Sequence, residues 1–240
     1  MVSILGIDTS AGACSAALWR DGAVMAAERQ AMARGHAEAL MPMIERVLAS
    51  AGLGYRDLAA VAVVAGPGAF TGLRIGLAAA RGIALAAGIP AIGVSAFAAI
   101  AAGIPAASRA GRAVAVAIDT KRGDVYLQCF DAQLAPVAAG RVVALADIEA
   151  ALPAGPVHVA GDGSPAVRRI LAGRDAVFAS DPAPPDAGVV AALGAAQLAG
   201  AQLAAAAGAR MPPPEPIYLR APEATPLALQ GKDPDRGRRR

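Results

Sequence analysis

Ile7-Asp8-Thr9 closes the apolar run that begins at Ile4, and the same three residues return in the second half of the chain as Ile118-Asp119-Thr120. Gly12 and Gly123 follow the two copies at the same offset. Each copy ends one strand-like run and leads directly into another, which is the setting of a hairpin between two strands. A repeated motif in a repeated setting predicts a chain built from two copies of one structural unit.

The elements around the repeat alternate between strands and helices. Behind the first hairpin, apolar residues spaced as on one helical face predict a helix over residues 35–51. A buried strand over 59–65 and a second helix over 71–87 follow, and Gly88 and Pro90 end that helix. The second half repeats the plan more loosely, with strands expected near 113–119, 124–131, 134–144 and 157–160 and helices near 145–152, 165–172 and 187–208.

This order of elements predicts the fold class α/β, with two duplicated subdomains that each contain a mixed sheet flanked by helices. Residues 1–108 are expected to form the first subdomain, 109–229 the second, and 230–240 a disordered basic tail. The proline runs at 182–185 and 212–214 are expected to be surface connections.

The composition excludes several classes of protein. Of the 240 residues, 56% are hydrophobic and only 17% are charged, which is not the composition of a disordered chain. Two cysteines are too few for a disulfide framework or a cysteine-rich zinc module. The net charge of +3 equals the excess of basic residues within 231–240, so the body of the chain is not a polybasic surface for nucleic acid.

The uncharged stretches are expected to be core segments. Asp8 interrupts the apolar N-terminal run, which has no basic residues before it, so this run is not a signal peptide. Residues 82–108 and 187–209 carry no charge, but they are rich in Ala and Gly rather than in Leu, Ile and Phe, which insert strongly into membranes. We therefore expect a cytoplasmic protein without a membrane segment.

Asp8 and Asp119 stand at the ends of the two repeated strands, an arrangement that suggests the plan of actin-like sugar kinases and heat-shock ATPases. In that plan the strand-end carboxylates and the hairpin amides approach the phosphates and metal of a nucleotide, so Asp8, Thr9 and Asp119 are candidate cofactor-binding residues. A hairpin that approaches phosphate closely favours several glycines, whereas residues 8–14 contain only Gly12. We therefore favour a structural role in which each aspartate caps its own turn.

Gly66-Pro67-Gly68 separates a predicted strand from a predicted helix, where backbone amides and the helix dipole can hold an anion. The run is not a P-loop, because Leu73-Arg74 stands where Lys-Ser/Thr is required. It is not a dinucleotide fingerprint, because Thr71 replaces the third glycine. A tight turn with close helix packing through Gly72 and Gly76 is the favoured interpretation.

Metal-binding side chains are scarce. His36 has Met32 and Leu40 at its helical i±4 positions, and neither side chain suits zinc or a hard metal. His158 lies within an apolar strand, where a hydrogen-bonded core histidine is the favoured interpretation. No Ser-His-Asp set can be assembled, and the sequence predicts no metal centre.

Several motifs resemble those of the TsaB (YeaZ) family. They are Gly-Pro-Gly-Ala-Phe-Thr-Gly-Leu-Arg-Ile-Gly at 66–76, Arg-Gly at 81–82, Ile-Pro-Ala-Ile-Gly-Val-Ser at 89–95, Ile-Asp-Thr-Ser at 7–10 and Pro-Ile-Tyr-Leu-Arg at 216–220. The resemblance is dense over residues 1–100 and thin from 130 to 210. It implies the ASKHA fold, which is the duplicated actin-like and RNase H-like architecture. It also implies a role in making N6-threonylcarbamoyladenosine beside the anticodon of tRNA.

The resemblance further implies a set of partners. Proteins of this family pair with the related catalytic subunit TsaD, which transfers the threonylcarbamoyl group, and the ATPase TsaE joins them. The family member itself is a non-catalytic scaffold that homodimerises when TsaD is absent, and it reaches tRNA through the complex. No cofactor is expected for this chain alone. A nucleotide at the subunit interface, the stoichiometry and the role of the basic tail stay open.

One departure from the catalytic relatives supports the scaffold role. After the same Gly-Val strand, TsaD-type proteins carry the His-x-x-x-His that binds their metal, and the matching positions here are Ala96 and Ile100. Neither side chain can coordinate a metal ion, so we expect no enzyme activity from this chain. The alternative is a stand-alone actin-fold ATPase or phosphotransferase that uses Asp8 and Asp119 with magnesium. A metalloprotease-like hydrolase is disfavoured by the missing histidine pair.

The resemblance places the partner interface on the first two helices, which map onto residues 36–50 and 71–86. Small residues permit close approach and methionines adapt to a partner, and Gly76→Leu is expected to block pairing while the monomer stays folded. The interface residues predicted in this way are His36, Leu40, Met43, Ile44, Val47, Gly72, Leu73, Gly76, Leu77 and Ala80. In the tail, Lys232 and four arginines are a weaker candidate contact for tRNA phosphates, and a solvated end is favoured.

Overall fold

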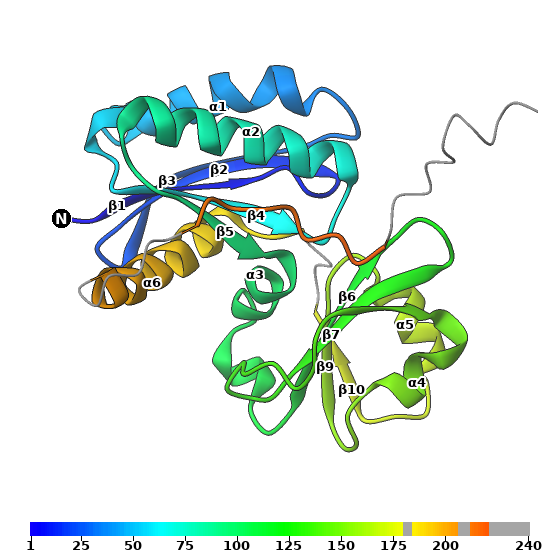
Figure 1. Cartoon of the computed structure of the whole chain (residues 1–240). Coiled ribbons are helices and arrows are strands. Elements are labelled where there is room, and N and C mark those ends of the chain that lie inside the picture. The colour runs from blue at the N-terminus through cyan, green and yellow to red at the C-terminus, as the bar shows by residue number, and fades with distance from the viewer. Residues whose placement is uncertain (180–183, 206–211, 221–240) are drawn as a thin grey trace, which may run out of the picture.

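The computed structural model describes residues 1–179, 184–205 and 212–220. Its first half contains a five-stranded mixed sheet with the strand order β3-β2-β1-β4-β5 (Figure 1). The central strand β1 is antiparallel to β2 and parallel to β4, and both β1 and β4 are buried along their whole length. The strands are β1 (Ser3–Asp8), β2 (Ala13–Arg20), β3 (Ala23–Ala31), β4 (Ala60–Gly66) and β5 (Ala91–Ser95).

The second half repeats this sheet strand for strand. Its order is β8-β7-β6-β9-β10, and the central strand β6 is antiparallel to β7 and parallel to β9. The strands are β6 (Ala113–Asp119), β7 (Asp124–Phe130), β8 (Arg141–Ala144), β9 (Val157–Ala160) and β10 (Ala176–Phe178). The duplication predicted from the repeated Ile-Asp-Thr motif is confirmed, and Asp8 and Asp119 each end the central strand of a sheet.

Two helices, α1 (His36–Ser50) and α2 (Phe70–Ala87), cover one face of the first sheet (Figure 1). The apolar stripe that predicts α1 is buried beneath the helix. α2 ends at Gly88, whose φ of 70° lies in the left-handed region that a Cβ disfavours. By length and composition α2 could cross a membrane, and seven of its 18 residues are buried within this chain.

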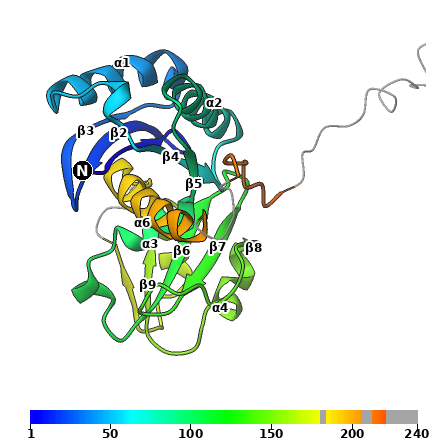
Figure 2. The same cartoon turned by 60° about the vertical axis from the view of Figure 1, so that its left-hand side comes forward.

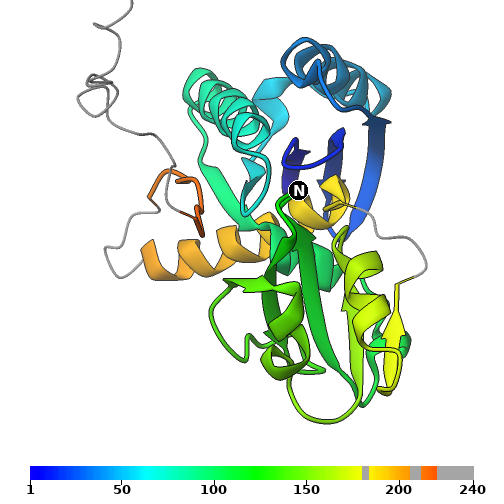
Figure 3. The same cartoon turned by 90° about the vertical axis from the view of Figure 1, so that its right-hand side faces the viewer.

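The last helix, α6 (Ala187–Ala205), covers the opposite face of the first sheet, as Figures 2 and 3 show from two sides. Glycines allow its close approach. A Cβ on Gly6 of β1 would stand 2.0 Å from a backbone oxygen of α6, and a Cβ on Gly194 would stand 2.4 Å from the Cβ of Ala62. The prediction that all of 109–229 forms the second subdomain therefore needs correction, because this helix packs on the first sheet.

A shared core joins the two subdomains. α3 (Ala96–Ala102) follows β5 and lies between the sheets (Figure 1). Phe97 of this helix belongs to the same apolar cluster as Val116 and Phe130 of the second sheet. The remaining short elements are η1 (Tyr55–Asp57), η2 (Ala106–Arg109), η3 (Leu145–Asp147), α4 (Ile148–Ala151) and α5 (Ser164–Ile170).

Two predictions about the strands of the second half need correction. The strand expected over 134–144 is confined to β8, because only a single bridge pairs Pro136 with Phe130 before it. β10 was not expected, because a strand of three residues gives almost no periodic signal. The predicted tail at 230–240 lies outside the described residues.

Residues 212–220, here called the C-terminal strap, run from the first subdomain toward the second (Figure 1). Pro214 is buried, and the backbone N–H of Ile217 donates to the carbonyl oxygen of Ala65 at 2.7 Å. A Cβ on Gly66 would stand 2.5 Å from the backbone of Ile217, so this glycine makes room for the strap. The expectation of a surface connection at 212–214 is confirmed for the exposed Pro212 and Pro213 and is wrong for the buried Pro214.

Candidate functional site: a closed cleft and an exposed pair of helices

The carboxylate of Asp8 caps its own turn. Its Oδ1 accepts a hydrogen bond from the backbone N–H of Ser10 at 2.9 Å. The side chain is fully buried, and its Oδ2 has no hydrogen-bond partner among the described residues. Burial raises the pKa of Asp8 to about 6, although the hydrogen bonds from Ser10 act to lower it. The predicted turn-capping role of Asp8 is confirmed.

α2 fills the space beside the Asp8 turn. A Cβ on Gly72 would stand 2.0 Å from the carbonyl oxygen of Thr9, and a Cβ on Gly68 would stand 2.5 Å from that of Ser10. The hydroxyl of Thr9 donates to the carbonyl oxygen of Gly72 at 2.7 Å. The predicted use of Gly72 and Gly76 for close helix packing is confirmed, because a Cβ on Gly76 would also meet Thr9, 2.6 Å from its Oγ1. Thr9, a candidate for nucleotide binding, holds α2 in place.

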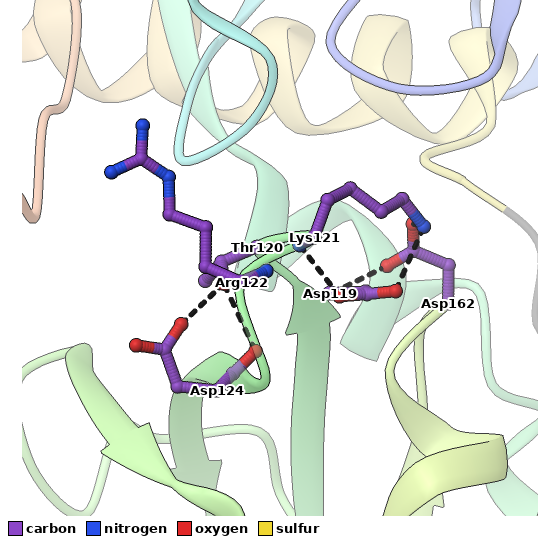
Figure 4. Close-up of polar contacts among 6 residues, drawn as sticks. All are labelled: Asp119, Thr120, Lys121, Arg122, Asp124 and Asp162. Atoms are coloured by element: carbon purple, nitrogen blue, oxygen red, sulfur yellow. Dashed lines mark hydrogen bonds and ion pairs between the residues drawn. The ribbon is translucent and has the colours of Figure 1, made fainter.

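Asp119 caps the corresponding turn, but its surroundings differ (Figure 4). Its Oδ1 accepts the backbone N–H of Lys121 at 2.7 Å, and its Oδ2 lies 2.8 Å from the Lys121 Nζ. The same Nζ lies 3.8 Å from Oδ2 of Asp162, whose Oδ1 accepts the backbone N–H of Asp119 at 2.8 Å. Burial acts to raise the pKa of Asp119, but the hydrogen bonds from Lys121 outweigh it and lower the pKa. An ammonium group therefore bridges the two carboxylates.

Asp162 and Lys121 are missed by the sequence-based predictions, although the duplication contains a signal for Asp162. It stands in Gly161-Asp162-Gly163 after β9, the counterpart of Gly66-Pro67-Gly68 after β4. The glycines of this second turn also permit close packing, since a Cβ on Gly161 would stand 2.3 Å from the carbonyl oxygen of Ala117. An alignment of the two halves beyond the Ile-Asp-Thr motif identifies this position.

The C-terminal strap connects α2 to the second hairpin. At one end, the ring of Tyr218 lies 5.4 Å from that of Phe70, centroid to centroid, and the Tyr218 hydroxyl accepts a hydrogen bond from Nε of Arg74 at 3.2 Å. At the other end, Arg220 forms an ion pair with Asp124 of β7. The strap therefore links the first subdomain to the second.

Little space remains between the two turns. The cavity there has a volume of about 10 Å³, comparable to one water molecule, and its walls include Ser10, Pro67, Ala96, Ile100, Ile118 and Asp162. Ala96 and Ile100 present only hydrocarbon to it. In the described ranges, no group of three or more His, Cys, Asp and Glu side chains could hold a metal ion. The donors present do not fit a magnesium nucleotide, because Asp8 is buried beside α2 and Asp119 is paired with Lys121.

The two histidines contact backbone oxygens. A ring nitrogen of His36 lies 3.2 Å from the carbonyl oxygen of Ala11, and Nδ1 of His158 lies 3.0 Å from that of Ser108. His158 is buried within β9. The interpretation of His158 as a hydrogen-bonded core residue is confirmed.

The residues predicted to form the partner interface lie on the inward faces of their helices. All except His36 are buried in the chain's own core, namely Leu40, Met43, Ile44, Val47, Gly72, Leu73, Gly76, Leu77 and Ala80. Gly76→Leu would therefore disrupt the monomer, because the added side chain meets Thr9 and Val63. This prediction needs correction, since helical periodicity identifies an apolar face but not what covers it.

The outward faces of α1 and α2 also carry apolar side chains. Leu85 of α2 is 86% exposed, and Met41 of α1 is exposed as well. The exposed Ala78 and Gly82 of α2 present little bulk. We call these four residues the exposed helix-pair face. The inward faces of both helices are covered by the chain's own core.

Comparisons with known proteins agree with the motifs. A family model described as TsaD, tRNA N6-adenosine threonylcarbamoyltransferase, matches residues 29–226. The tRNA threonylcarbamoyladenosine biosynthesis protein TsaB of Escherichia coli is 44% identical over 123 residues, which are 51% of this chain and 52% of that protein. The match thus spans about half the length of this curated relative. An uncharacterized protein of Mycobacterium tuberculosis is 35% identical over 232 residues, 95% of this chain and 96% of that one.

Solved structures extend the likeness to the whole fold. YeaZ from Pseudomonas aeruginosa matches with a TM-score of 0.74 and 30% identity, over 91% of this chain and 100% of that chain. An activator of 2-hydroxyisocaproyl-CoA dehydratase from Clostridium difficile shares the fold alone, with a TM-score of 0.50 and 11% identity over 88% of this chain and 99% of that chain. The predicted ASKHA class is confirmed. The YeaZ structure, matched over its whole length, and the curated TsaB relatives show that this chain belongs to the TsaB (YeaZ) family.

Proposed function

We propose that this chain is a non-catalytic subunit of the machinery that makes N6-threonylcarbamoyladenosine in tRNA, and that it acts in the cytoplasm as the partner of a TsaD-type transferase. The names of the curated TsaB relatives support the modification, and the TsaD family model supports kinship with the transferase. One observation carries the non-catalytic assignment. The carboxylates that an actin-like ATPase would offer to magnesium are buried beside α2 or bridged by Lys121.

The exposed helix-pair face is the surface we assign to the partner. α1 and α2 are held by the first sheet, so a partner that binds them orders few additional groups and keeps more of its binding energy. Leu85 can insert as an anchor and Met41 can adapt its shape. Ala78 and Gly82 allow a partner helix to approach closely. The same face would pair two copies of this chain when the transferase is absent.

The family resemblance suggests two further members of the complex, an ATPase and tRNA. A TsaE-type ATPase joins the pair, and tRNA is reached through the assembled complex rather than by this chain alone. The basic residues of 231–240, the weaker candidate for a tRNA contact, lie outside the described residues.

Titration calorimetry with the TsaD-type subunit of the same organism tests the proposal. The double variant Met41→Glu, Leu85→Asp should weaken binding about a hundredfold, because charges would be buried at the interface. Leu203→Asp is the matched control, because Leu203 is 79% exposed on α6, on the opposite face of the first sheet. It should bind like the parent chain.

Two results would overturn parts of this account. No binding by the parent chain would contradict the assigned partner, and full binding by the double variant would contradict the assigned face. Nucleoside analysis of tRNA from cells that lack this chain gives the functional readout. Threonylcarbamoyladenosine should disappear and should return with the parent chain or Leu203→Asp, but not with the double variant.

A further inference from the structure

The second subdomain contains a cavity that the proposed function does not use. It lies at the β7–β8 hairpin, beside the end of α4, and has a volume of about 200 Å³. None of its lining residues borders the small cavity between the subdomains. We call it the distal cavity. An engineered cavity of roughly 150 Å³ in another protein takes up benzene, so this space suits a small organic molecule and not a nucleotide.

The walls of the distal cavity are apolar. Leu127 and Cys129 of β7 line it together with Leu152 beyond α4, and all three are buried. Val137, which is exposed at the surface, also belongs to the apolar lining. The other apolar lining residues are Ala138, Ala139, Ala151 and Pro153. Burial raises the pKa of the Cys129 thiol to about 11, so the thiol is neutral at physiological pH and serves as wall rather than as nucleophile.

One cation of the cavity lining is unpaired. Arg141 lines the cavity, and its guanidinium makes no hydrogen bond or ion pair with any part of the chain that the structure describes. The nearby Arg174 differs, because its guanidinium donates to the carbonyl oxygens of Pro153 and Gly155. The side-chain amide of Gln128, the other polar group of the lining, is also engaged, since it donates to the carbonyl oxygen of Ala138 at 3.0 Å. The lining thus combines an apolar body with one available positive charge.

We propose that the distal cavity binds a small monocarboxylic acid, with the hydrocarbon body against Leu127, Cys129 and Leu152 and the carboxylate on the guanidinium of Arg141. A guanidinium offers a carboxylate two parallel hydrogen bonds, which a neutral alcohol cannot accept in the same way. The volume can hold a ligand of about eight to ten heavy atoms. This site is independent of the partner face on α1 and α2.

Titration of the full chain with hexanoate, followed in ¹H–¹⁵N correlation spectra, tests the proposal. Hexanoate should cause saturable shifts at residues that line the distal cavity. Hexan-1-ol should bind about tenfold more weakly, because it lacks the charge that pairs with Arg141. Acetate should bind too weakly to saturate, because it lacks the hydrocarbon body. Absence of saturable shifts with hexanoate, or equal binding of the alcohol, would overturn the proposal.

Three variants separate a site from non-specific association. Arg141→Gln should weaken hexanoate binding about tenfold and leave the alcohol unchanged. Ala151→Leu should remove binding of both, because the larger side chain fills the cavity, and dispersed spectra will show that the variant is folded. Arg169→Gln is the matched control, since Arg169 is exposed on α5 and does not line the cavity. Unchanged hexanoate binding by Arg141→Gln would refute the assigned role of the guanidinium.

Discussion

The two repeated hairpins share one turn and differ in their surroundings. In both, the strand-end aspartate accepts the backbone N–H two residues on, at 2.9 Å for Asp8 and at 2.7 Å for Asp119. Asp8 is fully buried beside α2, whereas Asp119 faces a Lys121 side chain that is 73% exposed. The duplication has kept the turn, while burial and neighbouring charges decide the chemistry of each carboxylate. The first hairpin is a packing element and the second is an ion-paired surface turn.

The largest effect that separates the hairpins should come from Gly72→Val. The added side chain would clash with the backbone of Thr9, so α2 would have to move away from the Asp8 turn. We expect a loss of about 3 to 4 kcal/mol in the free energy of unfolding, measured by urea denaturation. Gly82→Ala on the exposed side of the same helix meets nothing within 4 Å and should stabilise the chain by about 0.5 kcal/mol. Equal stability of the two variants would contradict close packing at the first hairpin.

Asp8→Asn should change how stability depends on pH. The pKa of Asp8 is raised in the folded chain, so its contribution is fully present below the unfolded pKa of 3.8 and is lost as pH rises through about 6. As pH rises from about 4 to about 8, the free energy of unfolding of the parent should therefore fall by about 2 kcal/mol relative to that of the variant. Asparagine can still accept the Ser10 N–H, so the turn itself is kept.

Denaturant melts of both proteins across this pH range provide the measurement. The difference between their free energies of unfolding cancels the titration of the groups that they share. A difference that is constant with pH would show that the Asp8 carboxyl titrates normally, and the contrast between the hairpins would then be lost.

Lys121→Met should have a smaller effect at the second hairpin. Removal of the ammonium leaves Asp119 and Asp162 without the cation between them. We expect the free energy of unfolding to fall by about 0.5 to 1 kcal/mol at neutral pH and low salt. The pKa of Asp119 is lowered, so the stabilisation is present above its unfolded pKa of 3.8 and is lost as pH falls below that value. High salt should reduce the loss, and an effect that salt leaves unchanged would argue against an ion-paired turn.

Asp124→Asn should have the smallest effect on global stability. It weakens the ion pair with Arg220, which is partly exposed, so the expected loss is about 0.5 kcal/mol. The strap should open locally more often, and amide exchange at Ile217, whose N–H is bonded to Ala65, should become faster. Exchange at the β1 amides should stay as slow as in the parent. Unchanged exchange at Ile217 would mean that the strap is held in place without the ion pair between Arg220 and Asp124.

The contrast between the hairpins also shows what the sequence could predict. The Asx turns follow from the residue types, because Asp at the end of a strand caps locally. The stripe of α1 follows from helical spacing. The bridge from Lys121 to Asp162 depends on two segments that meet only in the fold, so only an alignment of the two halves points to it.

The sequence predicts where helices form better than it predicts what each helix packs against. α6 consists mostly of small apolar residues without a distinct apolar side, so its sequence does not say which sheet it covers. The spacing of the apolar residues of α1 and α2 fits either a partner interface or the chain's own core. In the fold these residues are buried in the core. The sequence of the strap has neither helical nor strand periodicity. Its contacts are made by individual side chains, such as those of Tyr218 and Arg220, so periodicity could not predict them.

The most direct test of the central claim is equilibrium binding of Mg-ATP to the purified chain alone, measured by titration calorimetry. The claim is that the chain's own groups close the actin-like cleft, with α2 against the Asp8 turn and Lys121 between Asp119 and Asp162. It predicts no saturable binding at millimolar nucleotide. Saturable, magnesium-dependent binding that Asp119→Asn abolishes would contradict the claim and would favour an ATPase.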